Sequence, residues 1–147
     1  MIKTSRQQQR GAGLIEVLIS VLVLAVGLTG IAAMQVRSVK NNASALQHSI
    51  AVIQAQSMAD LLAISRNSAL AGDFNIDLTT NDPTDASFAP NSVTQWRSSI
   101  RNLLGTEATG SVNCVTATNK CVILVQWDNS RATEGSSTQQ VRVEIRL

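Results

Sequence analysis

The stretch GAGLIEVLISVLVLAVGLTGIAAM, residues 11–34, decides how the rest of the chain folds. The 23 residues from Ala12 to Met34, at about 1.5 Å each in a helix, extend roughly 35 Å, which exceeds the roughly 30 Å of hydrocarbon in a bilayer. The one charged side chain in this stretch is Glu16. An unpaired carboxylate there costs on the order of a few kcal/mol, so a segment that served only as an anchor would do better with Leu. We therefore expect Glu16 to have a partner, and this is the first indication of function.

The residues on either side of position 11 form a pattern. A short polar leader, residues 1–11, carries three basic side chains and ends in Gly11, and Glu16 follows five positions later. This pattern resembles the signal of the type IV pilin-like family, which includes type IV pilins and the pseudopilins of type II secretion. The resemblance implies that a prepilin peptidase cleaves between Gly11 and Ala12, and that Ala12 becomes the methylated N-terminus. Most members carry Phe or Met where this chain has Ala12.

Two other interpretations of the N-terminus stay open, an uncleaved membrane anchor and a conventional secretory signal. A secretory signal has a shorter apolar core, of about 7–15 residues, with a small-residue cleavage site just after it. The nearest such site, Ala43-Ser44-Ala45, lies well past the apolar run. The sequence therefore favours cleavage after Gly11.

The apolar run from Leu14 contains Gly27 and Gly30 but no Pro, and it is most similar to the PilV-type minor pilins. This resemblance implies a bacterial inner-membrane protein with a periplasmic head that is later assembled into a surface pilus. It also implies that the chain joins other minor pilins and the major pilin, primes assembly at the tip, and pairs Glu16 with the methylated amine of an adjoining subunit. The two glycines are either tolerated in a membrane helix or let the helix loosen inside a filament.

Length and charge exclude several classes of protein. A chain of 147 residues has room for one anchor and one small head. After the leader, nine Lys and Arg face ten Asp and Glu, which leaves about −1 and no electrostatic footprint for nucleic acid. The leader's basic residues favour a cytoplasmic N-terminus: Lys3, Arg6 and Arg10. The sequence has no catalytic motif and a single His, so we expect no enzyme, no cofactor and no metal site.

The apolar run also predicts the start of one long helix from Gly13 to Ser65, because no Pro or Gly interrupts residues 31–65. In its second half one face has residues at three-and-four spacing, and we expect this face to pack on the head: Leu46, Ile50, Ile53, Ser57, Leu61 and Ile64. His48 is expected to be an ordinary surface residue, since one imidazole without other ligands cannot hold a metal.

The region from Asn67 to Asn91 is rich in turn-forming residues and predicts a loop. Its Asp spacing loosely matches a calcium loop but lacks the central Gly and terminal Glu, so a solvated loop is favoured and a calcium site is the alternative. Phe74, Ile76 and Leu78 alternate and predict a short strand or a flap over the helix.

A second helix is expected from Ser92, where Ser92-Val-Thr-Gln95 fits a capping box, to Gly105, which suits a C-terminal cap. Trp96 falls on its apolar face and is expected in the core rather than in a ligand platform.

The C-terminal part predicts antiparallel strands. Residues 122–127 form an apolar run typical of a strand covered on both sides, and residues 141–147 alternate as a half-buried strand does. The polar loop between them is either a solvent loop or a contact to a neighbouring subunit. Cys114 and Cys121 enclose six residues, and in an exported head we expect them to form a disulfide, which would stabilise by roughly 2.5 kcal/mol in the chain-entropy model. Two Cys with one distant His make a poor zinc set.

These expectations combine into an α+β, pilin-like fold, in which a long N-terminal helix packs on a short helix and a small antiparallel sheet. The expected divisions are the cleaved leader (1–11), a transmembrane and assembly segment (12–34), a periplasmic half of the helix (35–66) and a globular head (67–147). The function expected is that of a minor pilin. The alternatives are a minor pseudopilin of type II secretion, an adhesin or DNA-receptor head, and a plain single-span membrane protein.

Overall fold

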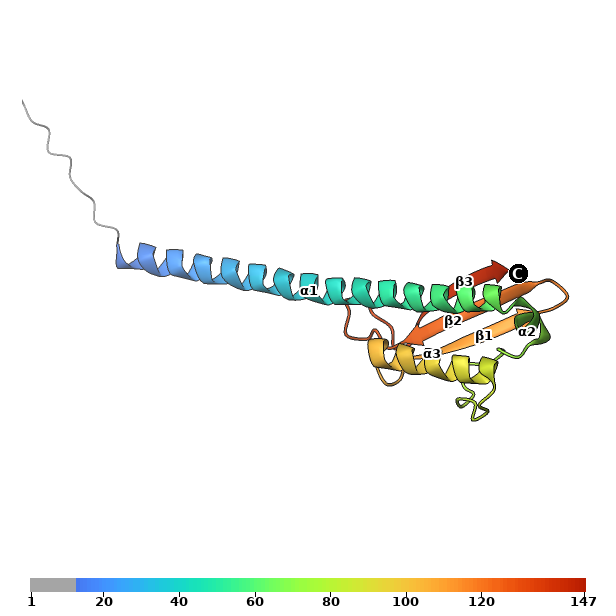
Figure 1. Cartoon of the computed structure of the whole chain (residues 1–147). Coiled ribbons are helices and arrows are strands. Elements are labelled where there is room, and N and C mark those ends of the chain that lie inside the picture. The colour runs from blue at the N-terminus through green and yellow to red at the C-terminus, as the bar shows by residue number, and fades with distance from the viewer. Residues whose placement is uncertain (1–12) are drawn as a thin grey trace, which may run out of the picture. The chain divides into compact units, whose positions relative to one another are not determined.

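A computed structural model of the protein describes residues 13–147 (Figure 1). It contains three helices and three strands: α1 Leu14–Ile64, α2 Arg66–Ala71, α3 Phe88–Leu104, β1 Thr109–Val115, β2 Lys120–Trp127 and β3 Gln139–Arg146. The long N-terminal helix, the short helices and the small antiparallel sheet confirm the expected α+β class. The chain divides into two units after Ser38, so that α1 contributes to both.

In its described part, the first unit is helical from Leu14 to Ser38. All of its side chains are exposed, and most are large and apolar; Leu14, at 80% exposure, is the extreme case. Among the helices in residues 13–147, only α1 is long and apolar enough to cross a membrane. Because nothing in the unit covers these side chains, lipid or other protein must cover them.

The second unit, Val39–Leu147, contains the hydrophobic core. Its three strands form an antiparallel sheet in the order β1-β2-β3, with Val112 opposite Ile123 and Ile123 opposite Val143. Alternate residues of β2 are fully buried on the core face, up to Trp127. The other face of β2 is only half-buried, so the expected strand covered on both sides is wrong.

Neighbouring long side chains explain the half-burial of that outer face. Opposite Val122 lies Glu144, whose carboxylate accepts a hydrogen bond from Lys120 Nζ at 2.7 Å. The stems of such side chains shield apolar surface while their charged ends stay in water. The outer face therefore needs no second layer of protein.

The face of α1 that packs into the core differs from the expected one. The buried residues are mostly small: Ala51, Ala55, Met58, Ala59 and Leu62. Of the residues expected there, Leu46, Ile53 and Ile64 are exposed by 61%, 63% and 85%. Ile50 and Leu61 are partly buried. Alanines let a helix come closest to the large core side chains of the sheet. The face of α1 with small residues therefore packs on the sheet, although the expected face has larger apolar residues.

Helix α3 begins four residues earlier than its expected start. Phe88 is its first residue and Ser87 its N-cap, and the Ser92 hydroxyl bonds back to the Phe88 carbonyl at 2.7 Å inside the helix. The expected capping box at Ser92 is therefore wrong. Pro90 does not end the helix because the first-turn N–H groups have no helical partner in any case. At the other end Gly105 follows α3 at φ 114°, a region that favours glycine.

The segment expected to be a loop is more ordered than its composition suggests. Its first residues belong to α2, and Ile76 forms an isolated antiparallel bridge to Val112 on the free side of β1. Next to this bridge, Asn75 accepts a hydrogen bond from the Cys114 N–H and donates one to the Cys114 carbonyl. Ile76 is buried, so the alternating residues here extend the sheet edge.

Strand β1 is missing from the strands expected from sequence. It has Gly110, Val112 and Cys114 on the core face, with Asn113 and Val115 exposed. A glycine and a cysteine at core positions weakened the alternating signal. Gly110 is needed there because a Cβ at this position would overlap the buried ring of Trp96.

Candidate assembly site

Glu16 lies in the first turn of α1, the third residue of the helix. Its backbone N–H donates to the Gly13 carbonyl at 2.8 Å, and its side chain is exposed. A carboxylate near a helix N-terminus interacts favourably with the helix dipole, which explains why a Glu is compatible with this end of the helix.

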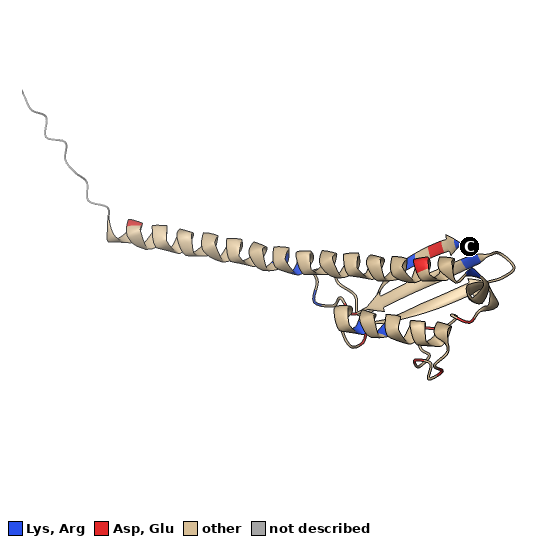
Figure 2. Ribbon diagram, in the orientation of Figure 1, with Lys and Arg blue, Asp and Glu red and all other residues tan. Residues whose placement is uncertain are grey.

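No ion pair reaches Glu16 within residues 13–147. From Glu16 the helix has no basic residue until Arg37, which at about 1.5 Å per residue is roughly 31 Å away along the axis. Figure 2 shows the first part of the helix without charge apart from one acidic residue near its start. The carboxylate is therefore a single charge on an apolar, uncovered helix.

The two predicted processing residues, Gly11 and Ala12, lie outside the described residues. Gly27 and Gly30 lie inside α1, which continues through both without a break. A Cβ built on either glycine meets nothing within 4 Å. Within the described chain these glycines thus have no packing role.

The cysteines lie opposite each other on neighbouring strands. Cys114 of β1 and Cys121 of β2 are register partners, with Cα atoms 4.0 Å apart, and they form a disulfide. The four-residue turn between the strands has Asn119 at φ 53°. The disulfide closes this hairpin on the core side of the sheet.

A buried arginine that the sequence analysis did not identify, Arg97, binds the loop before α3. Arg97 is 1% exposed, and its guanidinium donates to the backbone carbonyls of Gly110, Thr80 and Asp77. It also lies 3.4 Å from the carboxylate of Asp82. The signal in the sequence is its place on the apolar face of the helix, four residues after Val93 and three before Ile100.

The charges around Asp82 explain its titration. Partial burial acts to raise the pKa of Asp82, but hydrogen bonds and charge from Arg101 and Arg97 outweigh it and hold the pKa below its ordinary value. Burial lowers the pKa of Arg97, and Asp82 opposes that effect. Asp82, one of the acidic residues on which the calcium alternative rests, is thereby paired with two arginines.

The remaining predicted positions fall on ordinary surface or core. His48 is exposed, and its ring meets the buried Trp127 edge-on with centroids 5.9 Å apart. Trp96 is buried, and its indole N–H donates to the Gln54 carbonyl at 2.9 Å. The polar loop before β3 is tied to α1, since Asn129 donates to the Ser44 hydroxyl. No group of three or more His, Cys, Asp or Glu side chains in the described part of the chain could hold a metal ion.

Comparison with known families adds one finding. The family model of the prokaryotic N-terminal methylation motif matches residues 6–32, a range that contains Gly11, Ala12 and Glu16. No curated protein and no solved structure gives a significant match. The motif confirms a prepilin-type signal of the pilin-like kind at the start of the chain, and the apolar helix that follows fits a membrane-anchored protein. Pilins and pseudopilins share this signal.

Proposed function

We propose that this chain is a minor subunit of a type IV pilus, of the PilV type. Prepilin peptidase removes residues 1–11, Ala12 becomes the methylated N-terminus, and the chain waits in the inner membrane with its head in the periplasm. It then joins other minor pilins to prime assembly and takes a place at the tip of the fibre. Its role is structural, and it performs no catalysis.

The observation that carries this proposal is the lone carboxylate of Glu16 on an uncovered apolar helix within a matched methylation motif. In lipid the charge is costly, whereas in a bundle of similar helices it can meet the positive amine of a neighbouring subunit. An unpaired charge in an apolar bundle is strongly destabilising, so only helix arrangements that pair Glu16 are stable. The carboxylate then selects register and partner while the apolar residues supply most of the contact area.

The disulfide supports the periplasmic placement of the head. Disulfides persist in oxidising compartments such as the periplasm and are rare in the cytosol. The Cys114–Cys121 bond lies in the second unit, on the C-terminal side of the apolar segment. If the head lies in the periplasm and the leader in the cytoplasm, the disulfide is in an oxidising compartment and the basic residues before the span are on the side that they favour.

The proposal is tested by Glu16→Leu in the full chain. We expect export, membrane insertion, cleavage and thermal unfolding of the head to stay unchanged, because Glu16 is not one of the residues that form the second unit's core. Incorporation into sheared pili should fall at least tenfold, measured by immunoblot against the major subunit. Glu16→Asp, which keeps the charge, is the matched variant and should retain more incorporation than Glu16→Leu. Wild-type incorporation of Glu16→Leu would refute the pairing.

A minor pseudopilin is the second candidate because it would carry the same matched signal. Deleting the gene separates the two. Loss of surface pili and twitching with normal enzyme secretion supports the pilus. Loss of secretion with normal pili supports the pseudopilin.

A further inference from the structure

A groove of about 580 Å³ runs between the second half of α1 and helix α3. The two helices lie side by side, as the hydrogen bond from Trp96 to the Gln54 carbonyl shows, and Figure 1 shows α3 running opposite to α1. The floor is made by the buried side chains of Met58 and Trp96. At one end the walls are the apolar side chains of Leu61, Ile64 and Phe88.

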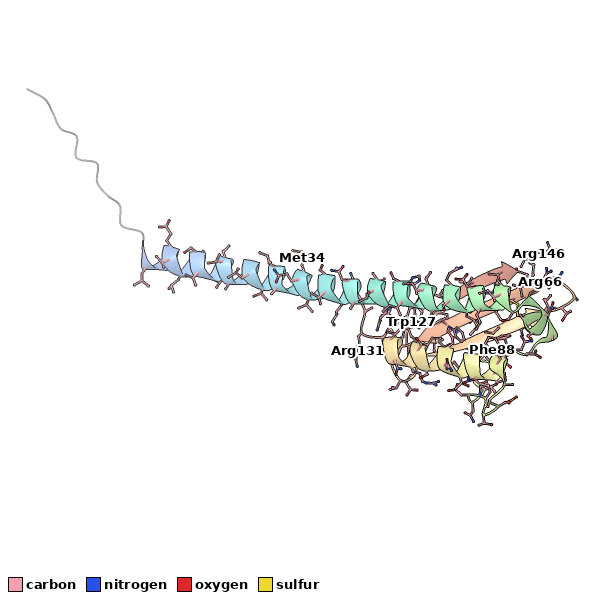
Figure 3. The ribbon with its side chains drawn as sticks, viewed as in Figure 1. Met34, Arg66, Phe88, Trp127, Arg131 and Arg146 are labelled. Atoms are coloured by element: carbon pink, nitrogen blue, oxygen red, sulfur yellow. A yellow bond between two sulfur atoms is a disulfide. The ribbon has the colours of Figure 1, made fainter. Side chains whose placement is uncertain are left out.

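One end of this groove exposes large apolar side chains to water. Ile64 is 85% exposed and Phe88 is 63% exposed. Figure 3 places Phe88 at the start of α3, at the same end of the second unit as Arg66. The exposed Leu46 and Ile53 precede Ile64 by 18 and 11 residues, spacings that keep all three on one side of α1. Single exposed apolar residues are ordinary, but a line of them beside a groove marks an interaction surface.

Only some of the polar groups that line the groove are bonded within the chain. The indole N–H of Trp96 and the hydroxyl of Ser92 both donate to backbone carbonyls, so neither has a donor left for a ligand. Asp60 is the single acidic or basic residue among those that line the groove. Its only side-chain partner in residues 13–147 is the amide of Gln56, at 3.3 Å. The groove thus presents an apolar end, polar side chains such as Gln54 and Ser57, and one acidic residue, Asp60.

These features select the chemistry of an occupant. Both walls are helices whose backbone groups are satisfied internally, so an added strand finds no free edge here. A third helix fits such a groove by placing its side chains between those of the two walls. Its apolar residues at three-and-four spacing would cover Ile64 and Phe88, and a Lys or Arg on the same helix would meet Asp60.

We propose that this groove, the α1–α3 groove, docks an amphipathic helix from a different subunit of the assembly, with an apolar face and one Lys or Arg opposite Asp60. The inference rests on the proposed function in taking the partner to be a neighbouring subunit. It goes beyond that function by assigning a second contact, in the water-exposed unit, that does not involve Glu16.

The test replaces Phe88 with the photoreactive residue p-benzoylphenylalanine in the full chain, in cells that carry the whole machine. The matched control places the same residue at Val115, which is 47% exposed at the end of β1, outside the groove. We expect at least tenfold more adduct from position 88 than from 115. Mass mapping should place the adduct on a helix of another subunit with a Lys or Arg within one turn. No adduct, equal adducts at both positions, or an adduct to lipid, to a second copy of this chain or to a non-helical segment would overturn the inference.

The charge is tested on the same background. Asp60→Lys should reduce the position-88 adduct at least tenfold, and reversing the partner's cation to Asp should restore it. Asp73→Lys, at an exposed residue outside the groove, should leave the adduct unchanged. Phe88 packs edge-on against Phe74, so replacing it could also disturb the head. Ile64→Ser removes an apolar side chain of the groove at a more exposed position. With the photoreactive residue placed at Ser92, Ile64→Ser should also reduce the adduct. An adduct that survives both Asp60→Lys and Ile64→Ser sinks the proposal.

The two proposals fail separately. If the wild-type chain is absent from pili and the adduct maps to a helix of a secretion subunit, the pilus function is refuted and the groove proposal stands. A chain present in pili without an adduct removes the groove and keeps the function.

Discussion

Arg97 shows how one residue can hold an irregular segment in place. Its guanidinium donates to three carbonyls, two of them in the loop at Asp77 and Thr80 and one in β1 at Gly110. Buried carbonyls need partners, and a planar guanidinium with several donors in fixed directions can satisfy several of them at once. Arg97 therefore holds the part of the loop at Asp77 and Thr80, beyond the bridge that Ile76 forms to β1.

Replacing Arg97 with Met should destabilise the second unit by about 3 kcal/mol, because the carbonyls lose their donors while the apolar stem is kept. The measurement is denaturant unfolding of the full chain in detergent micelles, followed by Trp fluorescence. Arg142→Met, at a side chain that is 61% exposed, is the control and should stay within about 0.5 kcal/mol of wild type. A cost for Arg97→Met as small as that of the control would contradict the assigned role.

Asp82 should make the stability of the second unit depend on pH. Its pKa is lowered in the folded chain, so the unfolded state binds the proton more tightly. The stabilisation is therefore fully present above the unfolded value, about 3.9, and is lost as pH falls through the lower folded value. Asp82→Asn should cost roughly 1–2 kcal/mol at pH 7 and flatten the loss of stability below about pH 4. Unfolding curves from pH 7 to pH 2 test this, with Asp73→Asn as the exposed control. An unchanged acid limb in Asp82→Asn would count against it.

At the scale of elements, α3 and β1 pack closely because Gly110 accepts the ring of Trp96. A methyl group there would overlap a ring that is also held by its bond to the Gln54 carbonyl. The ring cannot move away without losing that bond. The contact therefore fixes α3 against both β1 and α1.

Gly110→Ala should destabilise the second unit by roughly 1–3 kcal/mol, the usual cost of overpacking a core. The readout is the unfolding midpoint of the full chain in micelles. Gly27→Ala is the matched control, since a Cβ at Gly27 meets nothing within 4 Å. It should leave that midpoint unchanged. If Gly110→Ala were as stable as wild type, the close packing of Trp96 on β1 would be wrong.

At the scale of the whole molecule, the two units need opposite surroundings to be stable: the first needs an apolar environment, and the second is stable in water. The first exposes large apolar side chains and has no core of its own, while the second buries its apolar residues around the sheet. The first unit is stable only in lipid or against other helices, whereas the second is stabilised by its own core and disulfide. The leader that the proposed cleavage removes, residues 1–11, belongs to the first unit and contributes no residue to the second unit's core.

Processing should therefore yield a chain that begins at Ala12. Intact-mass measurement of the membrane-extracted protein should show loss of residues 1–11, with or without one methyl group, in a strain with active prepilin peptidase. Gly11→Val should keep the leader attached, because the small residue at the cleavage point is lost. A leader retained in the wild-type chain would remove the basis for methylation at Ala12.

The sequence by itself determined the features that depend on local composition. Residues 11–34 specify the apolar segment, the motif and the place of Glu16, because length, charge and spacing along a helix need no tertiary information. The single helix to Ile64 follows for the same reason, since no breaker interrupts it. The paired cysteines likewise indicated the disulfide, and an apolar run and an alternating segment indicated two of the three strands.

Only the tertiary structure decided which faces meet. The large apolar residues of α1 predicted that their face packs on the head. Ala51, Ala55 and Ala59 form the contact instead, because small side chains let the helix pack more closely on the sheet. Arg97 is buried because three distant carbonyls converge on it, a fact that no window of sequence contains. The α1–α3 groove also depends on tertiary structure: because the alanine face of α1 packs on the core, the large side chain of Ile64 stays exposed in the groove, where another molecule can cover it.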